Sequence, residues 1–104
     1  MFISAQIAVT AAGDVLAPTN VSAQTEQVLS NIELILAEVG ATLENVASTT
    51  VYLASLDHYA DFDKAYARRF GTHKPARAVV QAGLVRPGIV VAIQAIASLP
   101  TKGA

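Results

Sequence analysis

Arg77 is the residue of this chain best placed to bind an anion. It stands in the segment 75–80, Pro-Ala-Arg-Ala-Val-Val, as the one charged residue at the start of an apolar, strand-like run. No Asp or Glu follows Asp63, so no carboxylate side chain lies downstream to neutralise it. A guanidinium held against apolar surface needs an anion or water, and its planar fork suits a carboxylate. Arg77 therefore either binds a small carboxylate, or it reaches solvent or pairs with an upstream Asp or Glu.

Other chemistries find little support in the sequence. The six glycines form neither a dinucleotide-binding nor a phosphate-binding loop, and no serine stands in a GxSxG motif. His58 and His73 are separated by a whole predicted helix and are expected on the surface at its ends, so no metal site is predicted. The absence of cysteine excludes disulfides and thiolate chemistry. We expect a protein that uses no metal and no organic cofactor.

Length and composition predict one domain that associates with other subunits. With 104 residues there is no room for a second core, so residues 1–104 are expected to form a single domain. The chain is 53% hydrophobic and only 14% charged. A domain of this size buries roughly 60 to 70% of its unfolded surface. The surplus of apolar side chains must then lie on the surface or inside an oligomer.

The charges are few and are segregated along the chain. A net charge of −1 creates no general attraction for nucleic acid. All acidic residues lie between Asp14 and Asp63, and a basic stretch follows from Lys64 to Arg77. Such a stretch is typical of a solvated helix end, and RNA binding is the less favoured interpretation. Because the chain shows neither a secretory signal nor a membrane-length apolar run, a cytoplasmic protein is expected.

Hydrophobic periodicity predicts two helices. The first is capped by Asn20 or Ser22, carries an apolar stripe with spacings of three and four up to residue 39, and is ended by Gly40. The second is capped by Asp57, carries aromatic residues at the same spacings, and is ended by Gly71. Both patterns are typical of helices with one buried face.

Strand-like segments alternate with these helices in the order β-β-α-β-α-β-β. The sequence predicts an α+β fold in which two helices pack on one face of a mixed sheet. The last strand is apolar on both faces and must be covered twice, once by the helices and once, most simply, by another subunit. A turn at 86–88 joins it to the strand before. The predicted strands are 2–9, 15–17, 47–54, 77–82 and 89–99.

Several short stretches follow one another in an order typical of one family. They are Ser4-Ala5-Gln6, segment 23–31, segment 48–53, segment 59–62 with Tyr66 and Phe70, Pro75-Ala76-Arg77, and Gln94-Ala95-Ile96-Ala97. These matches are colinear and cover nearly the whole chain. In this respect the sequence resembles the reactive intermediate deaminases, the RidA/YjgF family.

The resemblance implies both an architecture and an activity. Family members are similar in architecture to the small trimeric chorismate mutase, and they form homotrimers whose three sheets face inward as a barrel, with clefts between adjacent subunits. In active members the Pro-Ala-Arg arginine, here Arg77, binds the substrate carboxylate. A glutamate near the chain end helps position the water that hydrolyses a C=N bond. The products are a 2-keto acid and ammonia, and no metal or organic cofactor takes part.

Gln94 is the main departure from the family pattern. It occupies the position of that glutamate, and an amide can orient water but cannot accept a proton from it as a carboxylate can. General-base assistance contributes about two to four powers of ten in rate. The resemblance therefore implies weak catalysis with Gln94 orienting water. The alternative is a strand residue that satisfies a sheet-edge or interfacial hydrogen bond.

Further departures concern the substrate-binding positions. Ala5 replaces a glycine whose backbone approaches the ligand, Asp63 lies near a position where relatives often carry Asn, and Val79 stands where several carry Cys. Ser4 and Gln6 share one face of the first strand by its period of two, and they either line the cleft or form an ordinary exposed face. Relatives usually carry a tyrosine in an earlier segment, and no residue of this chain is expected to inherit its role.

Two functions from different classes remain open at this point. The first is a RidA-like deaminase, a homotrimer acting on small carboxylated imines and enamines. The second is a non-catalytic homotrimer that binds a small carboxylate at its subunit interfaces. An RNA-associated protein using the basic stretch is a third and weaker interpretation, and no membrane partner is expected.

Overall fold

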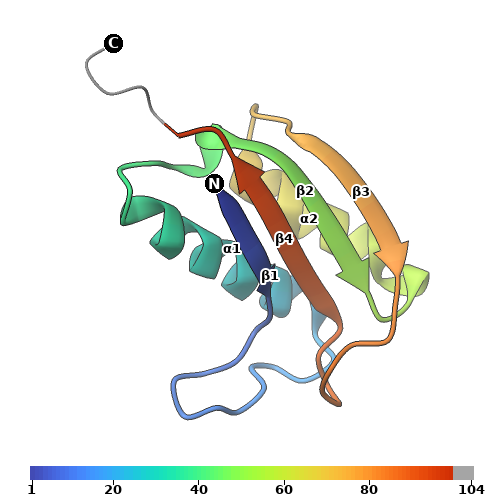
Figure 1. Ribbon diagram of the computed structural model, residues 1–104. Helices are drawn as coiled ribbons and strands as arrows, with labels where there is room; N and C mark the ends of the chain where they lie inside the picture. The colour runs from blue at the N-terminus through green and yellow to red at the C-terminus, as the bar shows by residue number, and fades with distance from the viewer. Residues whose placement is uncertain (100–104) are drawn as a thin grey trace.

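The computed structural model describes residues 1–99 as a four-stranded sheet with two helices on one face (Figure 1). The strand order is β1-β4-β2-β3, with β2 and β3 parallel and the other pairs antiparallel. The predicted α+β architecture is confirmed, and residues 100–104 of the predicted domain lie outside the described part. The elements are β1 (Phe2–Gln6), α1 (Val21–Ala37), β2 (Val46–Leu53), α2 (Tyr59–Phe70), β3 (Ala76–Gln81) and β4 (Val91–Ala97), with short 3₁₀ turns η1 (Leu43–Asn45) and η2 (Leu56–His58).

The strands are fewer and shorter than the sequence predicts. Residues 15–17 contribute only an isolated bridge between Val9 and Val15. Ala17 has a φ of 41° and Thr19 a φ of 64°, left-handed conformations that cannot continue an extended strand. β3 and β4 are not neighbours, because β2 lies between them. The connection 82–90, which contains the predicted turn at 86–88, therefore crosses β2.

Asn20 caps α1, as the sequence predicts. Its Oδ1 accepts a hydrogen bond from the Ala23 N–H at 3.0 Å, which satisfies a donor that the helix start leaves unpaired. The helix ends at Ala37, before the predicted residue 39, and Gly40 follows with a φ of 72°. Val39 is therefore 45% exposed instead of part of the core. The fully buried apolar face consists of Val28, Leu29, Ile32 and Leu36.

α2 starts through a short turn and not at the predicted cap. The Ser55 hydroxyl accepts a hydrogen bond from the Asp57 N–H at 3.1 Å and begins η2, after which α2 starts at Tyr59. Gly71 ends the helix with a φ of 62°. The aromatic stripe is core for the most part: Phe62, Tyr66 and Phe70 are buried, whereas Tyr59 is 39% exposed.

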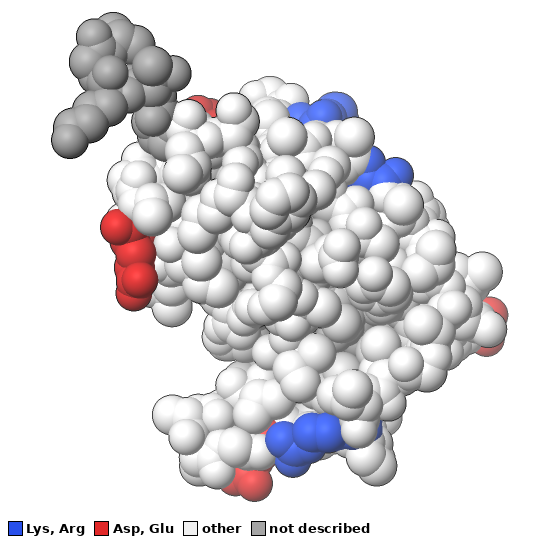
Figure 2. All heavy atoms as spheres, in the orientation of Figure 1, with Lys and Arg blue, Asp and Glu red and all other residues white. Residues whose placement is uncertain are grey.

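One face of β4 is covered by the helices and the other face is open. Toward the helices its residues are at most 3% exposed: Val91, Ile93, Ala95 and Ala97. On the other face lie Ala92, the half-buried Gln94 and Ile96, which is 38% exposed. Within residues 1–99 no helix covers this second face (Figure 1), and Figure 2 shows charged atoms only toward its margins. The doubly apolar last strand is thus confirmed, and its second face lies open in the single chain.

Candidate functional site

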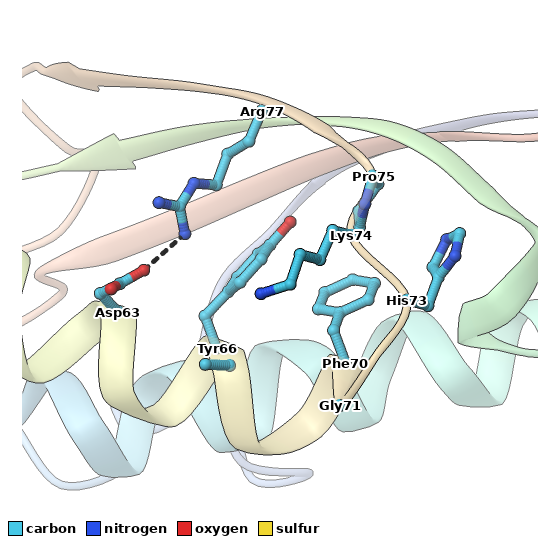
Figure 3. Close-up of a pocket in the computed structure, with 9 residues that line it drawn as sticks. Asp63, Tyr66, Phe70, Gly71, His73, Lys74, Pro75 and Arg77 are labelled. Atoms are coloured by element: carbon cyan, nitrogen blue, oxygen red, sulfur yellow. Dashed lines mark hydrogen bonds and ion pairs between the residues drawn. The ribbon is translucent and has the colours of Figure 1, made fainter.

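Arg77 points from β3 toward α2. It is the register partner of Thr49, whose hydroxyl lies 2.8 Å from the Tyr66 hydroxyl on the helix side of the sheet, so Arg77 shares that side. Its Nη1 donates to Asp63 Oδ1 at 2.8 Å (Figure 3), and its Nη2 donates to the Tyr59 hydroxyl at 2.8 Å. Within the single chain an upstream carboxylate, that of Asp63, therefore pairs with Arg77, and the binding of a small carboxylate by Arg77 stays a prediction.

Three aromatic rings, those of Tyr59, Phe62 and Tyr66, lie within cation–π distance of the guanidinium and form what we name the aromatic bed. The guanidinium carbon of Arg77 is 4.9 Å from the ring centre of Tyr66 and 5.6 to 5.7 Å from the other two. Such contacts contribute about 0.5 to 2 kcal/mol depending on solvation. The Arg77 side chain is only 23% exposed, although its strand forms the edge of the sheet. The bed holds the cation in one orientation before any ligand arrives.

These surroundings shift two pKa values upward. Partial burial is the largest single influence on the pKa of Arg77 and by itself would lower it. The hydrogen bond to Asp63 and the charge interactions with Tyr59, Asp63 and Tyr66 together outweigh burial, so the net shift of the pKa is upward. Burial raises the pKa of Tyr66, and the hydrogen bond to Thr49 and the charge of Arg77 oppose only part of that rise. At neutral pH the site therefore contains a permanent cation beside a neutral phenol.

A pocket of about 350 Å³ opens beside Arg77, between the end of α2 and the start of β3 (Figure 3). Its volume is that of a site for a small molecule. The rings of Tyr66 and Phe70 line it, as do the charged groups of Asp63, Lys74 and Arg77. Within residues 1–99 Lys74 makes no ion pair. We name this cavity the arginine pocket.

His73 also lines the arginine pocket, although the sequence placed it merely at a helix end. Its Nε2 lies 2.8 Å from the backbone carbonyl oxygen of Val46. A carbonyl oxygen can only accept, so Nε2 carries a proton and donates it. His73 therefore links the start of β2 to the pocket wall, and only its Nδ1 is left for another partner.

Gln94 lies on the opposite, open face of the sheet and lines a second pocket of about 420 Å³, which we name the glutamine pocket. The Tyr52 hydroxyl donates to Gln94 Oε1 at 3.3 Å. Ala5 and Ala92 line the same pocket with Ile7 and the connection 82–85. The structure therefore brings Gln94 and Ala5 together, but it does not bring Arg77 and Gln94 together within one chain.

Gln24 holds the connection 82–90 in place, and residues 82–85 of this connection line the glutamine pocket. Its side chain is fully buried in α1, and its Nε2 donates to the backbone carbonyls of Leu16, Ala17 and Gly88 at 2.7 to 3.2 Å. Its Oε1 accepts from the Val90 N–H at 2.9 Å. One amide thus satisfies four backbone groups from two loops, and this role was not predicted from the sequence.

Ser4 and Gln6 do not share one face of β1 as the period of two predicts, while their place in a cleft between subunits stays a prediction. The pairing of β1 with β4 shifts between Ile3 and Gln6, so one extra residue interrupts the alternation of faces. Gln6 becomes the partner of Ile93, which is buried beneath the helices, while Ser4 stays exposed. Ala5 and Ile7, not Ser4 and Gln6, line the glutamine pocket.

Val79 and Asp63 also take definite places. Val79 pairs with the buried Val51 and packs against the core, and it does not line the arginine pocket. Asp63 lines that pocket as the partner of Arg77, with its side chain 45% exposed. Tyr59, Asp63 and Tyr66 are spaced by four and three residues, so they share one face of α2. That spacing was the signal by which the environment of Arg77 could have been found.

Two further residues of the basic stretch, Arg68 and Arg69, pair with acidic residues of α1. Arg69 donates to the carboxylate of Glu26 at 3.3 Å and is paired with Glu33, and Arg68 lies 3.9 Å from Glu26. These pairs reduce the net positive charge along α2. Among residues 1–99 no group of acidic, histidine or cysteine side chains is arranged to hold a metal ion, and no helix there is long and apolar enough to cross a membrane.

Comparison with known proteins agrees with this fold. Residues 1–99 match the family described as endoribonuclease L-PSP. The protein HMF1 of Saccharomyces cerevisiae is 35% identical over 98 residues, which cover 94% of this chain and 75% of that protein. A RutC family protein of Pyrococcus abyssi is 33% identical over 97 residues, covering 93% of this chain and 76% of that protein.

Solved structures are similar over nearly the same span. A Thermotoga maritima protein described as a putative endoribonuclease superposes with a TM-score of 0.88 at 33% identity, covering 97% of this chain and 80% of that one. A Mycobacterium tuberculosis member of the YjgF/YER057c/UK114 family superposes with a TM-score of 0.82 at 26% identity, covering 94% and 77%. With its four-stranded mixed sheet, its two helices and these relatives, the chain belongs to the YjgF/YER057c/UK114 (RidA) family.

Proposed function

We propose that this chain hydrolyses small carboxylated imines and enamines to 2-keto acids and ammonia. The observation that carries the proposal is Arg77, a guanidinium held on an aromatic bed at a pocket of about 350 Å³. The family resemblance assigns carboxylate binding to this Pro-Ala-Arg arginine. Lys74 adds a second cation to the same pocket. Together they favour a small anionic ligand.

Arg77 retains the donors that such a ligand needs. A guanidinium has five N–H groups, and the hydrogen bonds to Asp63 and Tyr59 use two of them. Because the aromatic bed already fixes the side chain, binding costs little additional side-chain entropy. A ligand carboxylate would thus share Arg77 with Asp63 and would not have to displace it.

The proposed reaction needs modest help from the protein. Water adds to the electrophilic carbon of the C=N bond and one of its protons passes to nitrogen, which gives a carbinolamine. The hydroxyl proton of the carbinolamine then also passes to nitrogen, so the C–N bond breaks, ammonia leaves and the keto group forms. We assign Gln94 the role of orienting the water, because its amide can accept or donate a hydrogen bond. Positioning of the two reactants supplies most of the acceleration. The missing carboxylate makes the reaction slow relative to one that has a general base.

Bringing Arg77 and Gln94 to one substrate requires a second copy of the chain. The two side chains lie on opposite faces of one sheet, and the face that carries Gln94 is open and largely uncharged. We therefore propose the homotrimer that the family resemblance implies, with the open faces turned inward and the sites between subunits. Burial of Ile96 and its neighbours would stabilise this assembly.

A homotrimer that binds a small carboxylate without turnover is the second candidate. It is favoured by the amide at position 94 and by the ion pair that already satisfies Arg77 in the single chain. Both candidates require Arg77 for binding, so turnover is the property that separates them.

The decisive experiment measures ammonia or keto-acid release from 2-imino acids generated in situ by an amino acid oxidase. The purified protein is compared with a blank without protein and with Arg77→Ala. Arg68→Ala is the matched control, because it removes an arginine whose side chain is 63% exposed and lies outside both pockets. Acceleration that only Arg77→Ala abolishes supports the deaminase. No acceleration, combined with carboxylate binding that depends on Arg77, supports the second candidate.

A further inference from the structure

The arginine pocket contains charges of both signs. Arg77 and Lys74 are cations, and Asp63 is a carboxylate that lines the same cavity. One oxygen of Asp63 accepts from Arg77 at 2.8 Å, yet the side chain remains 45% exposed. A carboxylate has about four acceptor positions, so Asp63 can accept further hydrogen bonds. The pocket therefore offers a ligand an acceptor with negative charge as well as donors with positive charge.

This charge pattern discriminates between kinds of small carboxylate. A ligand that carries only a carboxylate meets two cations but also the like charge of Asp63, which disfavours it. A dianion such as phosphate carries two negative charges, and the carboxylate of Asp63 repels both. The Nε2–H of His73 is directed to the Val46 carbonyl, so this donor is not available to a ligand. A ligand with a carboxylate and an adjacent cationic nitrogen matches both signs at once.

We propose that Asp63 makes the arginine pocket select the zwitterionic, N-protonated form of its ligand, with the carboxylate on Arg77 and Lys74 and the cationic nitrogen beside Asp63. This inference rests on the proposed function, because it concerns the same site and the same class of carboxylate. It assigns a ligand charge state that the resemblance to the family does not.

Selection of the N-protonated form has a chemical consequence. The iminium R–C(=NH₂⁺)–COO⁻ is the electrophilic form that water attacks, and with one water it yields R–CO–COO⁻ and NH₄⁺. A carboxylate beside the nitrogen stabilises the iminium and holds it ready for attack. The keto-acid product has lost the cation, so it binds less tightly and leaves. Asp63 would in this way offset part of the loss that follows from an amide at position 94.

The test uses stable probes that differ in the charged nitrogen and share a tetrahedral carbon: 2-aminobutanoate, a zwitterion, and 2-hydroxybutanoate, a monoanion. Binding of each to the full chain is measured by NMR titration or calorimetry at neutral pH. We expect the zwitterion to bind roughly five- to tenfold more tightly, which is the size of a partly exposed charge interaction. Asp63→Asn keeps an oxygen that accepts from Arg77 but removes the charge, and it should abolish the preference. Asp63→Glu keeps a carboxylate and should retain most of it.

Asp61→Asn is the matched control, because it removes the same charge from the same helix at an exposed position that does not line the pocket. It should leave the preference unchanged. Equal or tighter binding of 2-hydroxybutanoate by the unmodified chain overturns the inference and leaves the proposed carboxylate site intact. A preference that survives Asp63→Asn also overturns it. Failure of both probes to bind overturns the proposed site together with the inference.

Discussion

The arginine pocket and the glutamine pocket lie on opposite faces of one sheet and differ in nearly every physical property. The first holds two cations and one carboxylate over aromatic rings, and α2 and β3 together build it. The second contains no charged group and is lined mainly by small and aliphatic side chains with Tyr52 and Gln94. Helices cover the first face, whereas the second stands open in the single chain (Figure 1).

The difference shows which part of the site is complete within one chain. The arginine pocket has its ion pair, its aromatic bed and its walls already in place within one chain. The glutamine pocket is an apolar hollow on an open surface, and its final shape depends on what covers it.

Removal of the aromatic bed should cost the most. Phe62 is fully buried and lies beneath Arg77, so Phe62→Ala creates a cavity and should lower the free energy of unfolding by about 3 to 5 kcal/mol. Leu34→Ala, at a position 69% exposed on the outer surface of α1, should cost less than about 1 kcal/mol. Denaturant unfolding of both variants provides the measurement. Similar losses of unfolding free energy in the two variants would contradict the conclusion that the aromatic bed is part of the core.

A charge on the open face should break the assembly. We expect the unmodified chain to elute with three times its 10.8 kDa mass in light scattering, and Ile96→Asp to elute as a monomer. An uncompensated charge buried in an interface costs several kcal/mol. Leu34→Asp, on the outer surface of α1 and 69% exposed, is the control that should leave the mass unchanged. A monomeric unmodified chain would contradict the trimer.

A carboxylate in the glutamine pocket should raise turnover. Gln94→Glu supplies a group that can accept a proton from water, and we expect deaminase activity to rise by about a hundredfold or more, because a general base contributes about two to four powers of ten. Gln81→Glu adds the same charge at the end of β3, outside both pockets, and should have no such effect. Imine hydrolysis in the oxidase-coupled assay is the measurement. Unchanged or lower turnover would indicate that Gln94 serves another ligand.

The smallest effect concerns the pH dependence of stability. Because the folded-state pKa of Tyr66 lies above its ordinary value of 10.0, the unfolded chain releases this proton first as pH rises. The contribution of Tyr66 to stability is therefore complete below pH 10 and is lost progressively as pH rises from 10 through the folded-state pKa. Tyr66→Phe should flatten this part of the decline in unfolding free energy. If the slope of unfolding free energy against pH were unchanged in Tyr66→Phe, burial would not raise the pKa of the Tyr66 phenol as described.

Most of the fold followed from local pattern. Helix periodicity predicted α1 and α2, and the glycines at 40 and 71 marked their ends because both adopt positive φ. The errors arose where tertiary context overrode a local signal. Segment 15–17 looked like a strand by its residues, but the left-handed Ala17 and Thr19 turn the chain away. Asp57 was predicted to cap the second helix, but the upstream Ser55 caps the short turn η2 instead.

The candidate site was predicted only in part. Arg77 stood out by its type and its neighbours, and Asp63 was noticed only as a departure from the Asn that relatives often carry. Neither observation revealed that the two side chains meet, because they belong to different elements. The parallel register that sets Arg77 against Thr49 places Arg77 over α2. The irregular pairing of β1 with β4, which places Ala5 in the glutamine pocket in place of Gln6, also had no local signal.

By itself the sequence determined the helices, the doubly apolar β4, the shortage of charge and the position of one unusual arginine, because these depend on residue type and on short-range spacing. Only the tertiary structure decided that Arg77 is paired with Asp63 and that Gln94 lies on the opposite face. The physical reason is that the face on which a strand residue lies depends on register. A shift of one residue in pairing reverses that face without any change in local preference.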